Sequence, residues 1–298
     1  MKLTFVWWNT SLSRAVAPNR STTLEQSIAS DLLALMCHDI RPDAICLGEI
    51  STEDIALLES VWATHGYGVL DGIRPVGRTS FDTCVLFRTD TLIALDNKDL
   101  VAQKGQRYFK VAQRFDFGVC DNETIIHLFV SHWPSRIHTP EDHPHRDFLG
   151  IRLRDAVKET RFEETQQHVI ILGDFNDEPF DAALSDHLMA TRDRALAAKK
   201  SHLLYNPFWR LLGCPIPYRQ TSQEMSPYSG SCYYRSGESA RWRTFDQIIF
   251  SPSFLGKTSW HLCEDLVQIL DFPFFTDIVR RAKHSFDHLP VIAVVEKA

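Results

Sequence analysis

Residues 171–177 read ILGDFND, an apolar run that leads directly into Asp174, Asn176 and Asp177. Together with the preceding residues it forms HVIILGDFN, a pattern that favours a buried β-strand over residues 168–176. The acids after such a strand either cap the next helix or are catalytic or metal-binding residues that the strand holds in place. The spacing alone does not choose between these two interpretations, so the rest of the chain has to decide.

The length and composition favour an ordinary globular protein. The chain has 298 residues, of which 44% are hydrophobic and 23% charged, enough for one large α/β domain or two small ones. No internal repeat or linker is evident, which favours one domain over residues 1–298. No apolar run approaches the roughly 20 residues that span a bilayer, and the N-terminus lacks the features of a signal peptide. We therefore expect a cytoplasmic protein.

The seven cysteines are scattered, with no CxxC pair and an odd total. This pattern indicates neither a disulfide framework nor a zinc site. Cys46 and Cys84 lie inside apolar runs, so we expect them to be small buried hydrophobic residues.

Charge is unevenly distributed along the chain. The formal net charge of −6 argues against a tight, general DNA-binding protein. Residues 190–245, however, contain nine Lys and Arg against three acids, together with nine aromatic residues. We interpret this stretch as a loop-rich insertion that faces the substrate. The alternative is a layer of loops whose aromatic rings pack onto a sheet and whose cations are solvated.

The pattern of apolar residues predicts strands alternating with helices. Thr22 and Glu25 form the capping-box signature of a helix start, and Pro179 suits a first helical turn. The three strands in the middle of the chain are expected to be antiparallel. The expected strands cover residues 3–9, 44–50, 82–88, 108–118, 123–133, 168–176, 244–251, 267–272 and the end of 285–295, and the expected helices cover 22–39, 53–66, 142–167 and 178–190.

Polar residues that interrupt apolar runs all fall at the ends of these strands. Each has a local explanation as a turn residue, a helix cap or a satisfied histidine. Together they suggest a site, because an α/β scaffold gathers side chains at the edges of its sheets. The set is rich in oxygen ligands and has no thiolate, which suits Mg²⁺, Mn²⁺ or Ca²⁺ better than zinc. Its members are Asn9, Glu49, His132, Asp174, Asn176, Asp246, Asp287 and His288.

The motifs that carry these residues resemble, in order, those of the exonuclease–endonuclease–phosphatase superfamily. GDFND and SFDHLPV in that order are the most specific part of the resemblance. It implies a four-layer α/β sandwich, with two mixed β-sheets face to face and helices outside. The motifs span nearly the whole chain and are WWN (7–9), LGE (47–49), FDTCVLF (81–87), SHWPSR (131–136), GDFND (173–177), TFDQIIFS (244–251) and SFDHLPV (285–291).

The resemblance also implies roles for individual residues. Glu49 resembles the principal metal carboxylate, with Asn9 beside it and Asp287 completing the metal and phosphate site. The catalytic roles fall on two histidines and the residues around them. His288 resembles the histidine that contacts the scissile phosphate, Asp246 the acid that orients it, Asp174 the residue that activates water or handles the leaving group, Asn176 a phosphate-positioning amide, His132 a second histidine, and Asp82 the acid that orients His132.

The chemistry is coherent on its own terms. Hydrolysis of a phosphodiester needs an in-line water, neutralised phosphoryl oxygens and help for the leaving alkoxide. A divalent ion, Mg²⁺ or Mn²⁺, and two acid–histidine pairs would supply these. Arg136, four residues after His132, is either a further cation for the phosphate or an ordinary solvated arginine.

The leading hypothesis is a metal-dependent nuclease that acts on DNA or RNA, with no obligate protein partner. Arg241, Arg243 and Trp242 are the expected substrate-binding residues of the 190–245 stretch. The alternative is a phosphatase or phosphodiesterase for small-molecule or lipid phosphates, which would suit the acidic net charge. A binding protein with an inactive site is disfavoured, because every principal residue is present.

Overall fold

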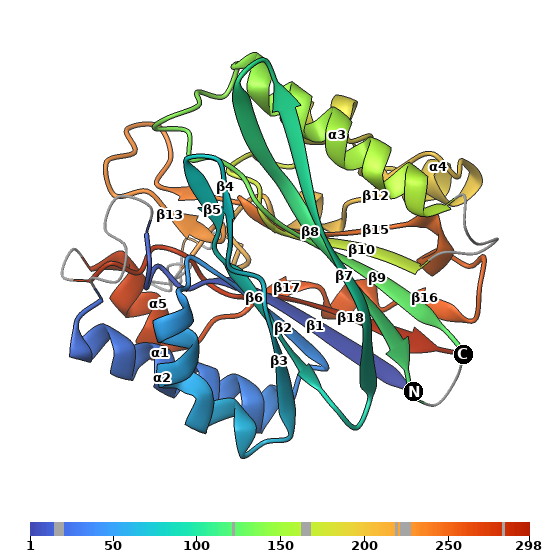
Figure 1. Ribbon diagram of the computed structural model, residues 1–298. Coiled ribbons are helices and arrows are strands. Elements are labelled where there is room, and N and C mark those ends of the chain that lie inside the picture. Colours follow the sequence, from blue (N-terminus) through green and yellow to red (C-terminus); the bar gives the residue numbers. More distant parts are fainter. Residues whose placement is uncertain (15–20, 121–122, 162–167, 218–219, 221–227, 282–283) are drawn as a thin grey trace.

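Two large β-sheets pack face to face, and helices cover their outer faces (Figure 1). The computed structural model describes residues 1–298 except 15–20, 121–122, 162–167, 218–219, 221–227 and 282–283. The expected four-layer α/β sandwich is confirmed. Of the described helices, none is long and apolar enough to cross a membrane.

The first sheet is built around the N-terminal and C-terminal strands, which pair antiparallel. Its strands run in the order β16-β18-β1-β2-β6-β3, and β17 also pairs with β18. These strands are β1 (Lys2–Asn9), β2 (Ala44–Gly48), β3 (Tyr67–Asp71), β6 (Thr83–Arg88), β16 (Trp260–Leu262), β17 (Gln268–Ile269) and β18 (Val291–Lys297).

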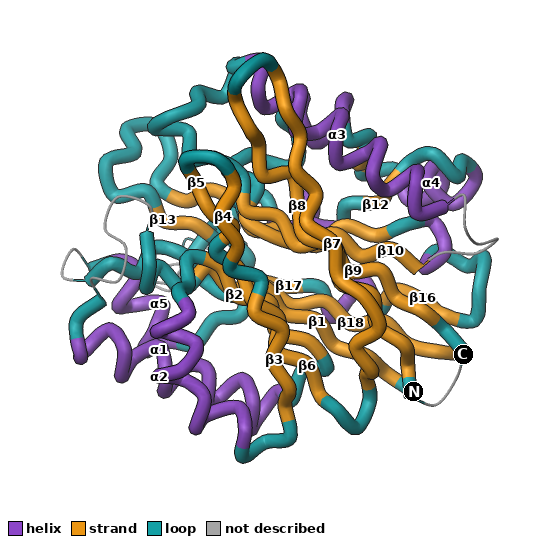
Figure 2. The backbone as a smooth tube through the Cα atoms, in the orientation of Figure 1, coloured by secondary structure: helices purple, strands orange, loops and turns teal. Residues whose placement is uncertain are grey.

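The second sheet has the order β11-β12-β15-β10-β9-β8-β7. Two short hairpins, β4–β5 and β13–β14, stand apart from both sheets (Figure 2). The strands of the second sheet are β7 (Leu92–Lys104), β8 (Arg107–Val119), β9 (Ile125–His132), β10 (His168–Asp174), β11 (Ala190–Thr191), β12 (Leu204–Tyr205) and β15 (Asp246–Phe250); the hairpins are β4 (Arg74–Val76), β5 (Thr79–Phe81), β13 (Cys232–Tyr233) and β14 (Trp242–Arg243).

The helices fall into two outer layers (Figure 1). On the side of the first sheet lie α1 (Thr23–Leu35), α2 (Thr52–Ala63) and α5 (Pro273–Arg280). On the side of the second sheet lie α3 (Pro144–Arg161) and α4 (Arg194–Lys199). The predicted capping box of α1 is confirmed, since Thr22 and Glu25 hydrogen-bond each other's backbone N–H groups.

Strand β1 shows how the alternation of side chains builds the core. Trp7 points toward the second sheet, where its Nε1 atom donates to Asp246. The next residue, Trp8, points the opposite way and packs against Phe275 and Phe286 in the helical layer. Both tryptophans are fully buried, and burying one large apolar side chain contributes roughly 1.5–3 kcal/mol.

The strand directions explain why the site lies at one edge of the sandwich. β1 and β2 are parallel, as are β9 and β10, so the C-terminal ends of these four strands face the same edge. The strands β6, β15 and β18 are antiparallel to their neighbours and begin at that edge. Hydrogen bonds from Trp7 to Asp246 and from Asn9 to Asp174 join the two sheets there.

Several expected elements differ from the structure. The helix expected over residues 178–190 is wrong in extent, because only Ala183–His187 is helical, as a single π turn. The helix expected over 142–167 runs from Pro144 to Arg161, and residues 162–167 lie outside the described part. Of the central strands, β6 and β8 are antiparallel to their partners as expected, whereas β9 is antiparallel to β8 but parallel to β10. In addition, β6 belongs to the first sheet and β8 and β9 to the second. Cys46 and Cys84 are fully buried, as predicted.

Candidate active site

The first residue of β15, Asp246, fixes the ring of His288. Its carboxylate is fully buried and accepts three hydrogen bonds, from Nδ1 of His288 (2.8 Å), Oγ of Ser231 (2.7 Å) and Nε1 of Trp7 (2.7 Å). A carboxylate can only accept at this distance, so Nδ1 carries the proton. The other ring nitrogen, Nε2, is therefore the atom that faces the site.

A second acid–histidine pair lies at the end of β9. Nδ1 of His132 is 2.9 Å from Asp82, whose other oxygen accepts from Lys110 at 2.9 Å. Burial acts to lower the pKa of His132, but the charge and hydrogen bond of Asp82 outweigh it and raise this pKa to about 9. Burial acts to raise the pKa of Asp82, but His132 and Lys110 hold it well below its ordinary value.

Asp174, the last residue of β10, lies between the two pairs. Its Oδ2 atom is 3.7 Å from Nε2 of His288 and 3.9 Å from Nε2 of His132. The same oxygen accepts from Nδ2 of Asn9 at 3.2 Å, and Oδ1 accepts from the backbone N–H of Asn176 at 2.8 Å. Burial raises the pKa of Asp174, although His288 opposes the shift. The carboxylate is thus held in place by neutral amides and faces two imidazoles.

Asn176 does not continue the strand, which corrects the expected strand over residues 168–176 to His168–Asp174. Its φ of 51° is left-handed, so the chain turns immediately after β10. Its side-chain amide donates to the carbonyl of Trp133 at 3.1 Å. The amide predicted to position a phosphate therefore also joins the loop after β10 to the loop after β9.

Left-handed backbone is concentrated at this edge of the sandwich. In the described part of the chain five residues other than glycine have positive φ, and three of them, Ser11, Glu49 and Asn176, belong to the site. Each costs about 1–2 kcal/mol relative to ordinary backbone. Strain of this kind persists where surrounding contacts hold it and is common at functional sites.

Glu49 and Asp287 lie on the side of the site formed by the first sheet. Arg14 bridges them, with Nη2 2.8 Å from Asp287 and Nε 3.7 Å from Glu49. Asp287 also accepts from Oγ of Ser11 at 2.9 Å. Burial raises the pKa of Glu49, and the nearest charged groups, Arg14 and His132, stand 3.7 and 3.9 Å away. This carboxylate is thus desolvated, and its ion pairs with Arg14 and His132 are long.

These residues fit a divalent cation. Glu49 and Asp287 provide carboxylate oxygens, as Mg²⁺ and Mn²⁺ prefer, and a cation would supply the charge that Glu49 lacks. Asp174, Asp246 and His288 also have ligand atoms within 4.8 Å of one another. Both oxygens of Asp246 and Nδ1 of His288 are already hydrogen-bonded, however, so this second group is better explained as an oriented histidine. Asn9 is adjacent, but its oxygen accepts from the N–H of Ser11.

Arg136 is engaged in contacts within the protein. It donates to the carbonyl of Asn176 at 2.9 Å and pairs with Asp181, Asp177 and Glu141. Its guanidinium lies over the ring of Phe245, 4.8 Å from the ring centre. These contacts support the loop after β10, and the predicted contact of Arg136 with substrate stays a prediction.

Asp177 pairs with an arginine and does not show the capping contact that the sequence allowed. It lies 3.1 Å from Nη1 of Arg146 on α3, and neither side chain is exposed. Arg146 also donates to the carbonyl groups of Pro134 and Thr139. The two acids of ILGDFND thus have different roles. Asp174 faces the site, and Asp177 anchors the loop after β10 to helix α3 through Arg146.

The aromatic residues of 190–245 mostly pack inward. Tyr205, Phe208 and Phe245 are buried, and Trp242 lies 4.9 Å from the ring of Tyr233 against the core. This agrees with the packed-loop alternative for those residues; Tyr218, Arg219 and residues 221–227 lie outside the described part.

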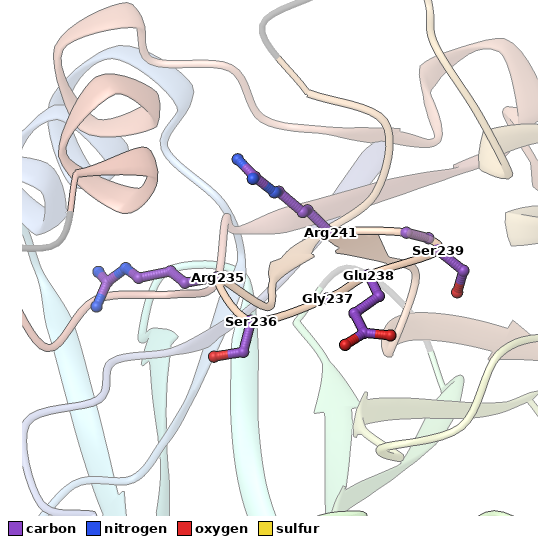
Figure 3. Close-up of a pocket in the computed structure, with 7 residues that line it drawn as sticks. Arg235, Ser236, Gly237, Glu238, Ser239 and Arg241 are labelled. Carbon is purple, nitrogen blue, oxygen red and sulfur yellow. The ribbon is translucent and has the colours of Figure 1, made fainter.

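The cations predicted to bind substrate differ in exposure. Arg243 is partly buried, with Nη1 3.9 Å from Glu178, whereas Arg241 is exposed. Arg241 borders an open hollow of about 530 Å³ around the β13–β14 loop, and it points away from Glu238 (Figure 3). None of the other predicted site residues lines this hollow.

Several residues at the site were not identified from the sequence. Arg14 and Lys110 lie in segments whose polarity looks ordinary, and Trp7 and Ser231 act on Asp246 from the neighbouring sheet and hairpin. Trp7 lies in the WWN motif, but its apolar ring indicated core packing only. The roles of these residues could be predicted only by knowing which strand ends lie together in the fold.

Comparison with known proteins agrees with this geometry. The Endonuclease/Exonuclease/phosphatase family matches residues 20–284. No curated protein matches the chain in sequence.

Similar solved structures share the fold at low sequence identity. The human Nocturnin catalytic domain with bound sulfate has a TM-score of 0.64 at 15% identity, covering 100% of this chain and 95% of that one. D. rerio TDP2 complexed with a single-strand DNA product has a TM-score of 0.59 at 13% identity, covering 99% of both chains. A Bacteroides thetaiotaomicron endonuclease/exonuclease/phosphatase family protein has a TM-score of 0.59 at 15% identity, covering 99% and 95%. The match over residues 20–284 establishes that the chain belongs to the Endonuclease/Exonuclease/phosphatase family, a family of phosphoester hydrolases.

Proposed function

We propose that the protein is a divalent-metal-dependent phosphodiester hydrolase that acts on DNA or RNA. The observation that carries this proposal is the convergence of His132 and His288 on one oxygen of Asp174. Each imidazole is fixed by its own carboxylate, and the oxygen ligands Glu49 and Asp287 lie beside them. One water and one phosphoryl group are proposed to bind next to this oxygen.

Asp174 is proposed to orient and deprotonate the attacking water. A carboxylate accepts a proton more readily when its pKa is raised toward the working pH, and burial raises the pKa of Asp174. The amide groups of Asn9 and Asn176 fix its two oxygens without neutralising it.

The two histidines are proposed to stabilise charge on the phosphoryl oxygens. Burial opposes protonation of His288, but Asp246 outweighs it and raises its pKa well above the ordinary value, and Asp82 does the same for His132. Both rings then carry a proton on Nε2 at neutral pH and donate toward the site. One donor aimed at developing oxyanion charge is typically worth 10²–10³ in rate.

Glu49 and Asp287 are proposed to hold the metal ion. When bound, the ion supplies Lewis acidity at the phosphoryl oxygen. Arg14 occupies the space between these carboxylates. Its guanidinium must withdraw from Asp287 for both carboxylates to become available.

A nucleic-acid substrate is supported by the solved D. rerio TDP2 complex, which contains a single-strand DNA product. The second candidate is a phosphatase or phosphodiesterase for small-molecule or lipid phosphates. The inward packing of Tyr205, Phe208 and Phe245 and the net charge of −6 favour this second candidate, since they reduce the stacking and cationic surface for a strand.

The test uses purified protein with Mg²⁺ or Mn²⁺ and five substrates: plasmid, single-stranded DNA, single-stranded RNA, bis(p-nitrophenyl) phosphate and p-nitrophenyl phosphate. We expect cleavage of the diester and of at least one nucleic acid, and loss of both with EDTA. An Asp174→Asn, His288→Gln variant serves as the inactive control. Hydrolysis of the monoester alone would favour the second candidate, and equal rates for wild type and control would refute hydrolysis at this site.

A further inference from the structure

The β4–β5 hairpin and the tip of the β7–β8 hairpin, both beside the site, carry cations and no acids. Residues 72–81, which form β4 and β5, contain Arg74 and Arg78 but neither Asp nor Glu. Residues 100–113, at the tip of the β7–β8 hairpin, contain Lys104, Arg107 and Lys110 and likewise no acid. The protein as a whole has a net charge of −6, so this local excess of positive charge departs from the rest of the molecule.

The two hairpins form one surface. A Cβ atom added to Gly77, in the turn between β4 and β5, would lie 3.0 Å from the ring of Tyr108 on β8. The hairpins also rise from the sandwich next to each other (Figure 1). We call the surface formed by Arg74, Arg78, Lys104, Arg107 and Tyr108 the hairpin surface.

The cations of the hairpin surface are available to a ligand. Arg74, Arg78, Lys104 and Arg107 are all exposed. Arg74 donates to a carbonyl group, Lys104 lies over an aromatic ring, and Arg107 contacts a ring and a histidine. In the described part of the chain none of these four forms a salt bridge with a carboxylate. Their charges also influence a neighbour: burial lowers the pKa of His145 first, and His143, Arg107 and Lys104 lower it further.

The hairpin surface leads directly into the site. Lys110 on β8 binds Asp82, the residue after β5, and Asp82 binds His132. Arg107 lies three residues before Lys110 on β8, which is about 10 Å at the usual rise of a strand. A chain of phosphates with one member at His132 would therefore reach Arg107 within a few nucleotides.

We propose that the hairpin surface binds the phosphate backbone of a nucleic-acid strand whose scissile phosphate lies at Asp174. This proposal rests on the proposed function and adds the side of the site on which the strand runs. Exposed Lys and Arg suit a row of phosphates. Tyr108, which is 46% exposed, adds a ring on which a base can stack. The surface includes neither Arg241 nor Trp242, so it does not depend on the sequence-based expectation for residues 190–245.

The experiment measures binding of a fluorescently labelled 20-residue oligothymidylate between 50 and 200 mM NaCl. All proteins carry His288→Gln and contain Mg²⁺, so that the strand stays intact. The test variant is Lys104→Ala, Arg107→Ala. The control variant is Lys98→Ala, Lys257→Ala, which removes two exposed cations, one of them from the same strand β7 but away from its tip. Thermal unfolding verifies that both variants are folded.

We expect the test variant to bind about tenfold more weakly at 100 mM NaCl. The slope of log K against log salt should become shallower by about 1.4, which corresponds to two lost phosphate contacts on a single strand. The control should stay within twofold of the parent protein. An unchanged slope, or an equal loss in the control, would overturn the proposal.

Two further arms separate the possible failures. Vesicles of phosphatidylserine and phosphatidylcholine test binding to an anionic lipid surface. If the test variant loses vesicle binding but binds the oligonucleotide as the parent does, the hairpin surface binds lipid and the proposal is overturned. Cleavage of the same oligonucleotide by the wild type tests the proposed function. If the wild type cleaves it and the slope is unchanged, only the hairpin proposal fails. If it neither binds nor cleaves nucleic acid, both fail.

Discussion

His132 and His288 direct their Nε2 atoms at the same oxygen, Oδ2 of Asp174, from 3.9 and 3.7 Å. His132 ends β9 of the second sheet, whereas His288 precedes β18 of the first sheet, and the two are 156 positions apart in sequence (288 − 132). Each is fixed through Nδ1 by a buried or half-buried carboxylate. A ligand that lies against Asp174 would therefore face two proton donors, the Nε2 atoms of His132 and His288.

Replacement of Asp246 by Asn should impair turnover more than binding. Asn keeps the shape but cannot accept from Trp7, Ser231 and His288 at once, so the His288 ring loses its fixed orientation. We expect kcat on bis(p-nitrophenyl) phosphate to fall by about 10²-fold or more, with KM changed severalfold at most. Asp246 is fully buried and acts as a positioning residue.

The matched control is a second buried acid–histidine pair outside the site. Asp116 lies 2.7 Å from Nδ1 of His127, five residues before His132 and so about 16 Å away along β9. Asp116→Asn should leave kcat within about threefold of wild type. An equal loss in both variants would mean that Asp246 acts through general stability.

The pKa of His132 should depend on Asp82. In the metal-free protein we expect this histidine to titrate near pH 9, because the charge of Asp82 outweighs the opposing effect of burial. In Asp82→Asn burial and Lys110 lower the pKa and only Asp174 still raises it, so the pKa should fall toward the ordinary value of about 6.5. Titration of the histidine ring signals by NMR measures both values. A His132 that titrates near 6.5 in the wild type would contradict the ion pair.

The same pair makes stability depend on pH. The folded protein keeps the His132 proton up to about pH 9, whereas the unfolded chain releases it near pH 6.5. The stabilisation is therefore complete below pH 6.5 and is lost as pH rises through about 9, by no more than about 3 kcal/mol. Urea unfolding of metal-free wild type and Asp82→Asn at pH 6 and 9.5 should show the loss in the wild type and little of it in the variant.

The sequence predicted the elements that carry strong local signals. The capping box at Thr22 and the apolar runs of β1, β2, β10 and β15 are of this kind. Strand β7 (Leu92–Lys104) was missed because its centre, LDNKDL, is polar and exposed. It forms an edge of the sheet through backbone pairing with β8, a contact that no periodicity reveals. Helix α5 was also missed, since Pro273–Arg280 is short.

At the site, residues that carry chemistry in their own side chains were predictable. Asp174, Asp246 and His288 interrupt apolar strands, which is a visible signal. The residues that position them could not be predicted in the same way, because the sequence around Trp7 indicates a core position and that around Arg14 indicates a loop. The helix expected over 178–190 is limited to Ala183–His187, and Asp181, which was expected inside it, pairs with Arg136. Tertiary contacts of this kind override the local pattern.

Arg14 should weaken metal binding. Its guanidinium lies between Glu49 and Asp287, so a divalent ion has to compete with it. Removal of this charge in Arg14→Gln should tighten Mn²⁺ binding, measured by isothermal titration calorimetry, by about threefold to tenfold. Arg280→Gln, at an exposed position at the end of α5, is the control and should bind Mn²⁺ as the wild type does. Unchanged or weaker affinity in Arg14→Gln would show that Arg14 does not oppose the ion.

Arg146 should be essential for stability. Its side chain is fully buried and pairs with Asp177, so Arg146→Met leaves this buried carboxylate with only its longer contact to Arg136, at 3.4 Å. The expected loss is about 3–5 kcal/mol of unfolding free energy in urea, partly recovered in Arg146→Met, Asp177→Leu. Arg152→Met on the same helix breaks only an exposed ion pair and should cost about 1 kcal/mol or less. Similar losses for Arg146 and Arg152 would contradict this role of the buried pair.

The most direct test of the proposed site is the turnover of bis(p-nitrophenyl) phosphate by Asp174→Asn in the presence of Mn²⁺. Asn preserves the size of the side chain but cannot take a proton from water. If Asp174 is the group on which both histidines converge, kcat should fall by about 10²–10⁴-fold while urea unfolding shows a folded protein. A folded Asp174→Asn protein that retains kcat within about fivefold of wild type would contradict it.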